Sequence, residues 1–241
     1  MKGLAVIAFG TSHKDTYEKN IRPIYDHLKE NFDGQTELAF TSRIIKRILE
    51  KHGEFVFNEK EVIAKLQETC DEIYILPLHI LRGFEYEKIE RIGLGKVAKP
   101  LLETEEDIEF FAKNINLPKD KAIIFMGHGT EHQVDWVYGE VEEAFKKLGY
   151  DKVFVGTVEG SRSIEDILPR VKEAGITEVI LRPLMLVAGD HAKNDMAGDD
   201  EDSWKSILER EGIKVDAQLI GLGEEEFVRD MYYANLKEIM N

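Results

Sequence analysis

The sequence predicts an α/β fold of two similar halves, each with a parallel β-sheet flanked by helices. Short apolar runs alternate with amphipathic segments of helical period along the whole chain. The alternation stops at a polar stretch, residues 117–120, and then starts again. Motifs at the ends of the apolar runs also recur, in the same order, in the second half. We therefore expect lobes at residues 1–118 and 119–241, with an active-site cleft between them.

The first half begins with an apolar run at residues 3–9, which predicts a strand, and an amphipathic segment at residues 14–31, which predicts a helix. Ser42 is a suitable N-cap for a short helix that runs to Leu49. The same reasoning gives the other elements. They are strands at 36–40 and 72–81, and helices at 59–68, 84–97 and 103–113.

In the second half, a helix at residues 163–174 is opened by Ser163 and closed by Gly175. A later helix starts at Asp199 or Ser203 and ends at Arg210. The other predicted elements are strands at 122–126, 152–156, 178–187 and 214–220, and helices at 132–148 and 224–240.

The halves match in detail at two places. FGTSH at residues 9–13 matches HGTEH at 128–132, and LPLHILRGFE at 76–85 matches RPLMLVAGDH at 182–191. In these registers Phe9 takes the place of His128, and Glu85 takes the place of His191. Two matches in order, each at a strand end, indicate an internal duplication.

Composition narrows the class of protein. The 241 residues suffice to bury roughly 70% of the unfolded surface, and no apolar window approaches the ~18 residues of a membrane span. A net charge of −15 disfavours nucleic acid and anionic membranes as partners. The chain opens directly into a strand without a targeting signal, so we expect a cytoplasmic protein. The single Cys70 excludes an internal disulfide and is interpreted as structural.

His128 and His191 are the first candidates for function, because each lies beside glycine or an acid at a strand end. Ligands of parallel α/β sheets bind outside the carboxyl ends of the strands. A histidine there can accept a proton near neutral pH or bind a metal ion. The alternative is a hydrogen-bonded structural role. His27 and His52 are in polar helical settings and are interpreted as solvated.

Glu159 follows a third strand in the same half. A carboxylate beside two imidazoles is a known arrangement for divalent metals, and the same three groups could serve as paired bases with an acid that stays charged. The alternative is that Glu159 caps the helix near Ser161 and Ser163.

Two glycine turns, Gly10-Thr11-Ser12 and residues 127–130, offer backbone N–H groups at helix starts, where anions bind. A carboxylate ligand suits them, whereas the nucleotide fingerprints GxGxxG and GxxxxGK[ST] are absent. The acidic segment at 195–202 is interpreted either as a solvated loop or as a path that attracts metal ions.

These motifs resemble those of the anaerobic sirohydrochlorin cobaltochelatase family, ATP-independent class II chelatases that also include ferrochelatase. The resemblance spans nearly the whole chain and is strongest in PLMLVAGDHAKNDMAGDDEDSW at 183–204, with MGHGTEH, GTVEGS, FGTSHKDT and PLHILRGFEYEKI in support. It implies insertion of Co(II) into sirohydrochlorin during cobalamin synthesis. By matching motifs, it implies His128, His191 and Glu159 as catalytic and metal-binding residues.

The resemblance also implies that Glu85 lines the substrate site and that the turn at Gly10, Thr11 and Ser12 binds macrocycle carboxylates. Two alternatives stay open: a chelatase for iron or nickel, and a non-catalytic tetrapyrrole or metal carrier. The helix patterns single out no interface, so a homo-oligomer is left open.

Overall fold

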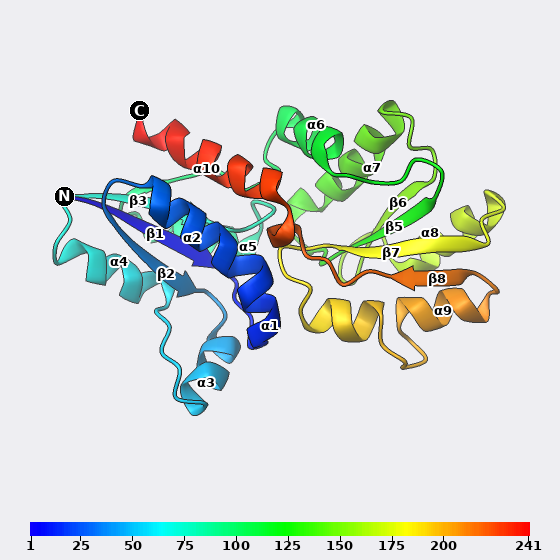
Figure 1. Cartoon of the computed structure of the whole chain (residues 1–241), viewed down its shortest axis with the longest axis horizontal. Helices are drawn as coiled ribbons and strands as arrows, with labels where there is room; N and C mark the ends of the chain where they lie inside the picture. Colours follow the sequence, from blue (N-terminus) through cyan, green and yellow to red (C-terminus); the bar gives the residue numbers. More distant parts are fainter. The chain divides into compact units, whose positions relative to one another are not determined.

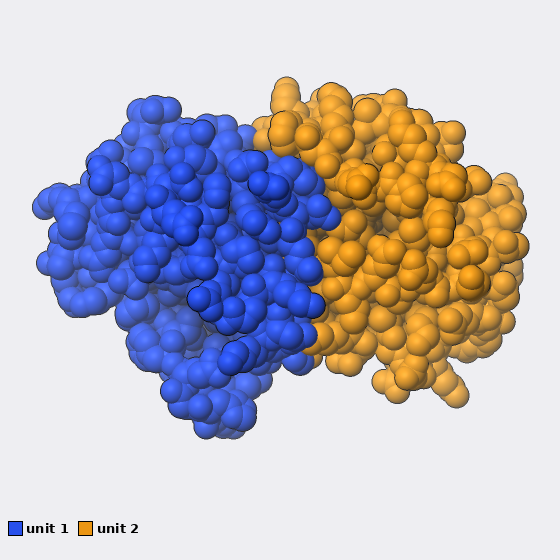
Figure 2. Space-filling view, viewed as in Figure 1, with its two compact units in different colours: residues 1–103, 223–241 blue, residues 104–222 orange.

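The computed structural model describes all 241 residues and divides into two compact units (Figures 1 and 2). Unit 1 comprises Met1–Glu103 and Gly223–Asn241, and unit 2 comprises Thr104–Leu222. Each unit has one four-stranded sheet in which all strand pairs are parallel, flanked by helices, which confirms the predicted fold class. None of the helices combines the length and the apolar composition that crossing a membrane requires.

Unit 1 has the strand order β2-β1-β3-β4. Its elements are β1 (Lys2–Ala8), α1 (Lys14–Thr16), η1 (Tyr17–Ile21), α2 (Arg22–Asn31), β2 (Gln35–Phe40), α3 (Arg43–Lys51), α4 (Glu59–Gln67), β3 (Glu72–Pro77), α5 (Phe84–Glu90), β4 (Lys96–Val97) and α10 (Glu226–Met240). The predicted helix at 14–31 is present as α1, η1 and α2, with a π turn in its middle. Helix α4 packs on one face of the sheet, where Ile63 joins Ile7 and Ile75 in an apolar cluster.

Unit 2 has the strand order β6-β5-β7-β8, which repeats that of unit 1 and supports the duplication. Its elements are α6 (Glu105–Asn114), β5 (Ala122–Gly127), η2 (Gln133–Trp136), α7 (Val137–Lys147), β6 (Val153–Thr157), α8 (Ile164–Glu173), β7 (Glu178–Leu184), η3 (Ala192–Met196), α9 (Trp204–Arg210) and β8 (Lys214–Ala217), and η4 (Leu222–Glu224) leads back to unit 1. Helices α8 and α9 bury one face of the sheet, with Ile167 and Leu208 fully enclosed.

Polar caps fix several helix starts. The Ser42 side chain accepts a hydrogen bond from the Ile45 N–H, as predicted for α3. The Ser203 side chain accepts one from the Ser206 N–H at 3.1 Å, so α9 starts at Ser203 and not at Asp199. Ser163 opens α8.

Four predicted boundaries are wrong. Strands β3, β7 and β8 end at Pro77, Leu184 and Ala217, short of the predicted 81, 187 and 220. The chain leaves the sheet after Leu78, and the carbonyls of His79 and Ile80 accept hydrogen bonds from the N–H groups of Leu101 and Leu102. The helix predicted at 84–97 ends at Glu90, because glycines with positive φ follow and the chain then forms the short strand β4 beside β3.

The compact units differ from the predicted lobes at both boundaries. Helix α6 belongs to unit 2, where the ring of Phe111 packs 6.4 Å from that of Phe145 in α7. Helix α10 belongs to unit 1, where Asn235 donates a hydrogen bond to the Pro100 carbonyl at 3.0 Å. Each half of the repeat therefore places its last helix in the other unit, a consequence of packing that local sequence patterns do not reveal.

Candidate functional site

His128 and His191 follow β5 and β7, which are neighbouring strands in the centre of the unit 2 sheet. The chain adds β6 on one side of β5 and β7 on the other, so the strand order reverses between β5 and β7. Parallel sheets bind ligands at such a switch point. The structure thus brings the imidazoles of His128 and His191 together, as their places at neighbouring strand ends predict.

The two rings are in edge-to-face contact. Their centroids lie 4.8 Å apart and their planes are inclined by 89°. The His191 side chain is 37% exposed, and His128 is exposed as well. A ligand arriving from solvent can therefore reach both.

Hydrogen bonds fix which ring nitrogens carry the protons. The Nδ1 atom of His128 lies 2.9 Å from the Gly129 carbonyl oxygen. A carbonyl oxygen only accepts, so Nδ1 carries the hydrogen and Nε2 of the neutral ring has a free lone pair. The Nδ1 atom of His191 lies 2.7 Å from a carboxylate oxygen of Asp195. Both imidazoles thus leave Nε2 available to bind a metal ion or accept a proton.

Gly129 joins the loop of His128 to the loop that carries Glu159. The Glu159 N–H donates to the His128 carbonyl at 2.7 Å. Gly129 has φ +80°, and a β-carbon at this position would lie 1.1 Å from the Glu159 carbonyl oxygen. Only glycine permits this close backbone approach.

The backbone of Glu159 is hydrogen-bonded to His128, but its carboxylate does not form a cluster with the two imidazoles. Glu159 is exposed, and nowhere in the structure do three or more His, Cys, Asp or Glu side chains converge as metal ligands. The cap of α8 comes from Ser163 and Asp166, so Glu159 is not its capping acid. The preformed part of the site is the histidine pair.

Two buried side chains that the sequence did not single out hold these loops. Asp135 accepts hydrogen bonds from the Thr130 N–H at 3.1 Å and from the Ser161 hydroxyl at 2.6 Å, so it ties the loop after β5 to the loop after β6. Tyr138 accepts one from the Gly129 N–H at 3.1 Å, and burial raises its pKa to about 12. Neither side chain belongs to a recognised sequence motif, and the contact of Asp135 with Ser161 spans 26 residues of sequence.

In unit 1, the turn at Gly10, Thr11 and Ser12 follows β1 at the matching place. Gly10 has φ +102°, and a β-carbon there would lie 2.6 Å from the Phe40 ring. Thr11 is buried, and its hydroxyl serves the turn itself: it accepts from the His13 N–H at 3.1 Å and lies 2.9 Å from the Thr16 hydroxyl. Ser12 is half-buried and is free to meet a ligand.

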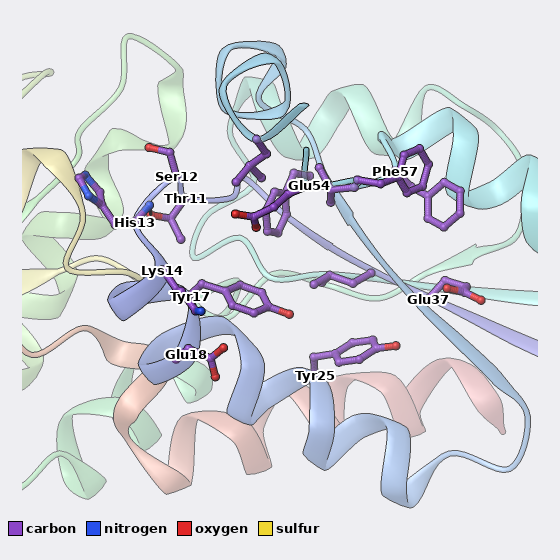
Figure 3. A pocket seen from close by; sticks show the side chains of 15 residues that line it. Thr11, Ser12, His13, Lys14, Tyr17, Glu18, Tyr25, Glu37, Glu54 and Phe57 are labelled. Carbon is purple, nitrogen blue, oxygen red and sulfur yellow. Dashed lines mark hydrogen bonds between the residues drawn. The ribbon is translucent and has the colours of Figure 1, made fainter. Parts of the chain in front are cut away.

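A cavity of about 430 Å³ opens beside this turn (Figure 3). Thr11 and Ser12 line one end of it, together with His13 and Lys14. Aromatic side chains make up much of the remaining wall. They are Tyr17, Tyr25, Phe40, Phe55 and Phe57. Three carboxylates, those of Glu18, Glu37 and Glu54, also line the cavity, so it joins a polar turn to a mixed aromatic and acidic wall within unit 1.

Glu85 lies in the first turn of α5, and its carboxylate pairs with Lys88. Nearby, both ring nitrogens of His79 are buried without a hydrogen-bond partner in the protein. Burial lowers the pKa of His79 to about 4; Lys88 adds to this effect and Glu85 opposes it. These surroundings favour the neutral form of the His79 imidazole.

His79 should make stability depend on pH. Between about pH 6.5 and pH 4 the unfolded chain binds a proton at this residue and the folded chain does not, so stability falls as the pH falls, by at most roughly 3 kcal/mol. Met185 stands at the matching position of unit 2 and is buried. We expect His79→Met to reduce the loss measured by urea unfolding at pH 7 and pH 4. An unchanged pH dependence would contradict a depressed pKa.

The acids of the segment at 195–202 have different partners. Asp195 contacts His191, whereas Asp199 pairs with Lys205 at 2.8 Å. Asp200, Glu201 and Asp202 are exposed.

Known proteins share this architecture. The fold is similar to that of SirB from Bacillus subtilis with Fe3+, with a TM-score of 0.65 and 14% identity over 99% of this chain and 95% of that one. It is also similar to the sirohydrochlorin chelatase SirB from Bacillus subtilis subspecies spizizenii in complex with cobalt, with a TM-score of 0.61 and 12% identity over 99% and 94%. These likenesses show that the chain shares the fold of these proteins, with two parallel α/β units.

Sequence comparison is more specific. A family model described as cobalt chelatase (CbiK) matches residues 2–241. The sirohydrochlorin cobaltochelatase of Salmonella typhimurium is 34% identical, covering 100% of this chain and 97% of the relative. Sirohydrochlorin cobaltochelatase CbiKC of Nitratidesulfovibrio vulgaris is 32% identical over 98% and 89%. The chain belongs to the cobalt chelatase (CbiK) family, which confirms the predicted family and enzyme class.

Proposed function

We propose that the protein inserts Co(II) into sirohydrochlorin as a step of anaerobic cobalamin synthesis, without ATP. The observation that carries this proposal is the pair of imidazoles, His128 and His191, whose Nε2 atoms are both free at neighbouring strand ends. The names of the relatives support the choice of metal and macrocycle.

Metal insertion exchanges two pyrrole protons for one divalent ion, so the site must accept protons and hold a metal on the same face of the macrocycle. A neutral imidazole does both near neutral pH. Nitrogen ligands bind Co(II) well enough to deliver it. We assign both roles to His128 and His191. We assign Glu159 as the third metal-binding group, and its exposed carboxylate would have to turn toward the pair when the ion arrives.

Unit 1 is proposed to bind the macrocycle. Sirohydrochlorin carries several carboxylates, and the free Ser12 hydroxyl at the turn is a suitable donor to one of them. Gly10 permits the turn and Thr11 braces it from within. Glu85 is proposed to line the same substrate site. We propose the cytoplasm as the compartment, in keeping with a single unpaired cysteine.

The test is an anaerobic absorbance assay of purified protein with sirohydrochlorin and Co(II), Fe(II) or Ni(II) in turn. We expect acceleration over the uncatalysed rate, fastest with Co(II). His128→Ala should lower kcat/KM by about 10²–10⁴-fold, because it removes a proton acceptor that touches the reacting centre. His52→Ala is the matched control, since His52 is exposed at the end of α3 in unit 1.

Each alternative predicts a different outcome. Faster insertion of Fe(II) or Ni(II) than of Co(II) would reassign the metal and keep the chemistry. A tetrapyrrole carrier would bind sirohydrochlorin without accelerating insertion of any metal, and His128→Ala would then change neither property. Either result would overturn the cobaltochelatase proposal.

A further inference from the structure

We propose that Asp195 is a positioning residue, which holds His191 in the tautomer and orientation that present Nε2 to the metal ion. The inference rests on the proposed function and adds a residue to it. Its basis is the 2.7 Å contact between the Asp195 carboxylate and Nδ1 of His191. A carboxylate oxygen accepts the Nδ1 hydrogen and leaves the lone pair on Nε2.

The local backbone supports this contact. His191 precedes the π turn η3, and Asp195 lies four residues further on, within that turn. Ala192 and Met196, which directly follow His191 and Asp195, are fully buried in the apolar core of unit 2. The partly exposed side chains of His191 and Asp195 therefore extend from a segment that the core holds in place, and the backbone of that segment sets the distance between them.

The two histidines of the pair share this arrangement but differ in the acceptor. For His128 the acceptor is the backbone carbonyl of Gly129, and for His191 it is the side chain of Asp195. Both rings consequently present Nε2, as a site that binds one ion with two imidazoles requires. Only the second acceptor can be removed by substitution, which makes the role of Asp195 testable.

Asp195 also differs from the other acids of its segment. Asp199 is 96% exposed and pairs with Lys205. A general attraction of cations would depend on all the acids of the segment, whereas positioning depends on Asp195 alone. Asp199→Ala is therefore a matched control that removes the same charge from the same segment.

The experiment measures the tautomer directly, by long-range ¹H–¹⁵N NMR correlation on metal-free protein labelled with ¹⁵N-histidine. We expect the neutral His191 ring to carry its hydrogen on Nδ1 in the native protein and in Asp195→Asn, whose amide oxygen also accepts. Asp195→Ala should shift the population toward Nε2–H. Asp199→Ala should leave the spectrum unchanged.

Chelatase assays on the same proteins give the second readout. Asp195→Ala should reduce kcat/KM for Co(II) by about 10–100-fold, with the KM for sirohydrochlorin little changed, and Asp195→Asn should recover most of the loss. A native His191 with its hydrogen on Nε2, or an Asn variant as impaired as the Ala variant, would overturn the inference. If the tautomer shifts as expected but the native protein inserts no metal, the proposed function fails and the positioning role stands.

Discussion

Replacing Gly129 by alanine is expected to destabilise the protein by about 3–5 kcal/mol and to abolish metal insertion. The new β-carbon would overlap the Glu159 carbonyl oxygen, at 1.1 Å, and the residue would also be held at φ +80°. To relieve the overlap, the loops after β5 and β6 must separate, which moves His128. Urea unfolding and the anaerobic insertion assay measure the two effects.

Gly149→Ala is a control that introduces the backbone strain of a positive φ without the steric overlap expected for Gly129→Ala. Gly149 has φ +81°, but a β-carbon there meets nothing within 4 Å. This variant should lose only about 1 kcal/mol and keep its activity. If Gly129→Ala were no more damaging than Gly149→Ala, the close contact between the two loops would not be a requirement of the fold.

Glu142→Ala is expected to destabilise the protein by about 3–5 kcal/mol. The Glu142 side chain is almost wholly buried in α7, where it accepts from the Val155 N–H at 2.9 Å and from Arg162 at 2.7 Å and also pairs with Arg170. Its removal leaves two arginines and a strand N–H without their common acceptor. Unfolding by urea at pH 7 measures the loss.

The neighbouring Glu143 provides the control. Glu143 is 54% exposed and pairs only with Lys146, so Glu143→Ala should lose less than about 1 kcal/mol. Burial alone would raise the pKa of Glu142, but the hydrogen bonds from Arg170 and Val155 outweigh it and the pKa is lowered. The stabilisation is thus present above the unfolded pKa and is lost as the pH falls through the folded one. An equal loss in both variants would contradict the buried network.

The fold could be predicted from sequence because strands and helices alternate with distinct periods and because the halves repeat. Strand β4 could not, since Lys96–Val97 is too short to show a period and is recognised only by its pairing with Tyr74–Ile75. The ends of β3, β7 and β8 could not be predicted for a related reason. Beyond Pro77, Leu78 is buried and Ile80 and Leu81 are half-buried outside the sheet, and composition does not distinguish this burial from burial in a strand.

The site divides in the same way. The contact between His128 and His191 could be predicted, because strand ends are visible in sequence and parallel sheets place them together. The hydrogen bonds that select Nε2, and the bracing of the loops by Asp135, depend on distances that no spacing encodes. The contribution of the Glu159 carboxylate stays a prediction.

Because α6 belongs to unit 2 and α10 to unit 1, the chain cannot be divided at the repeat boundary into two complete units. Cutting at the repeat boundary near residue 118 would leave the first half with α6 but without α10, which packs on α2 and β3. The second half would keep α10 and lose α6, the partner of α7. Neither piece would contain the terminal helix that packs in its own unit, but two identical half-length chains could complete each other by trading their last helices. The duplicated protein therefore has the connectivity of a domain-swapped dimer fused into one polypeptide.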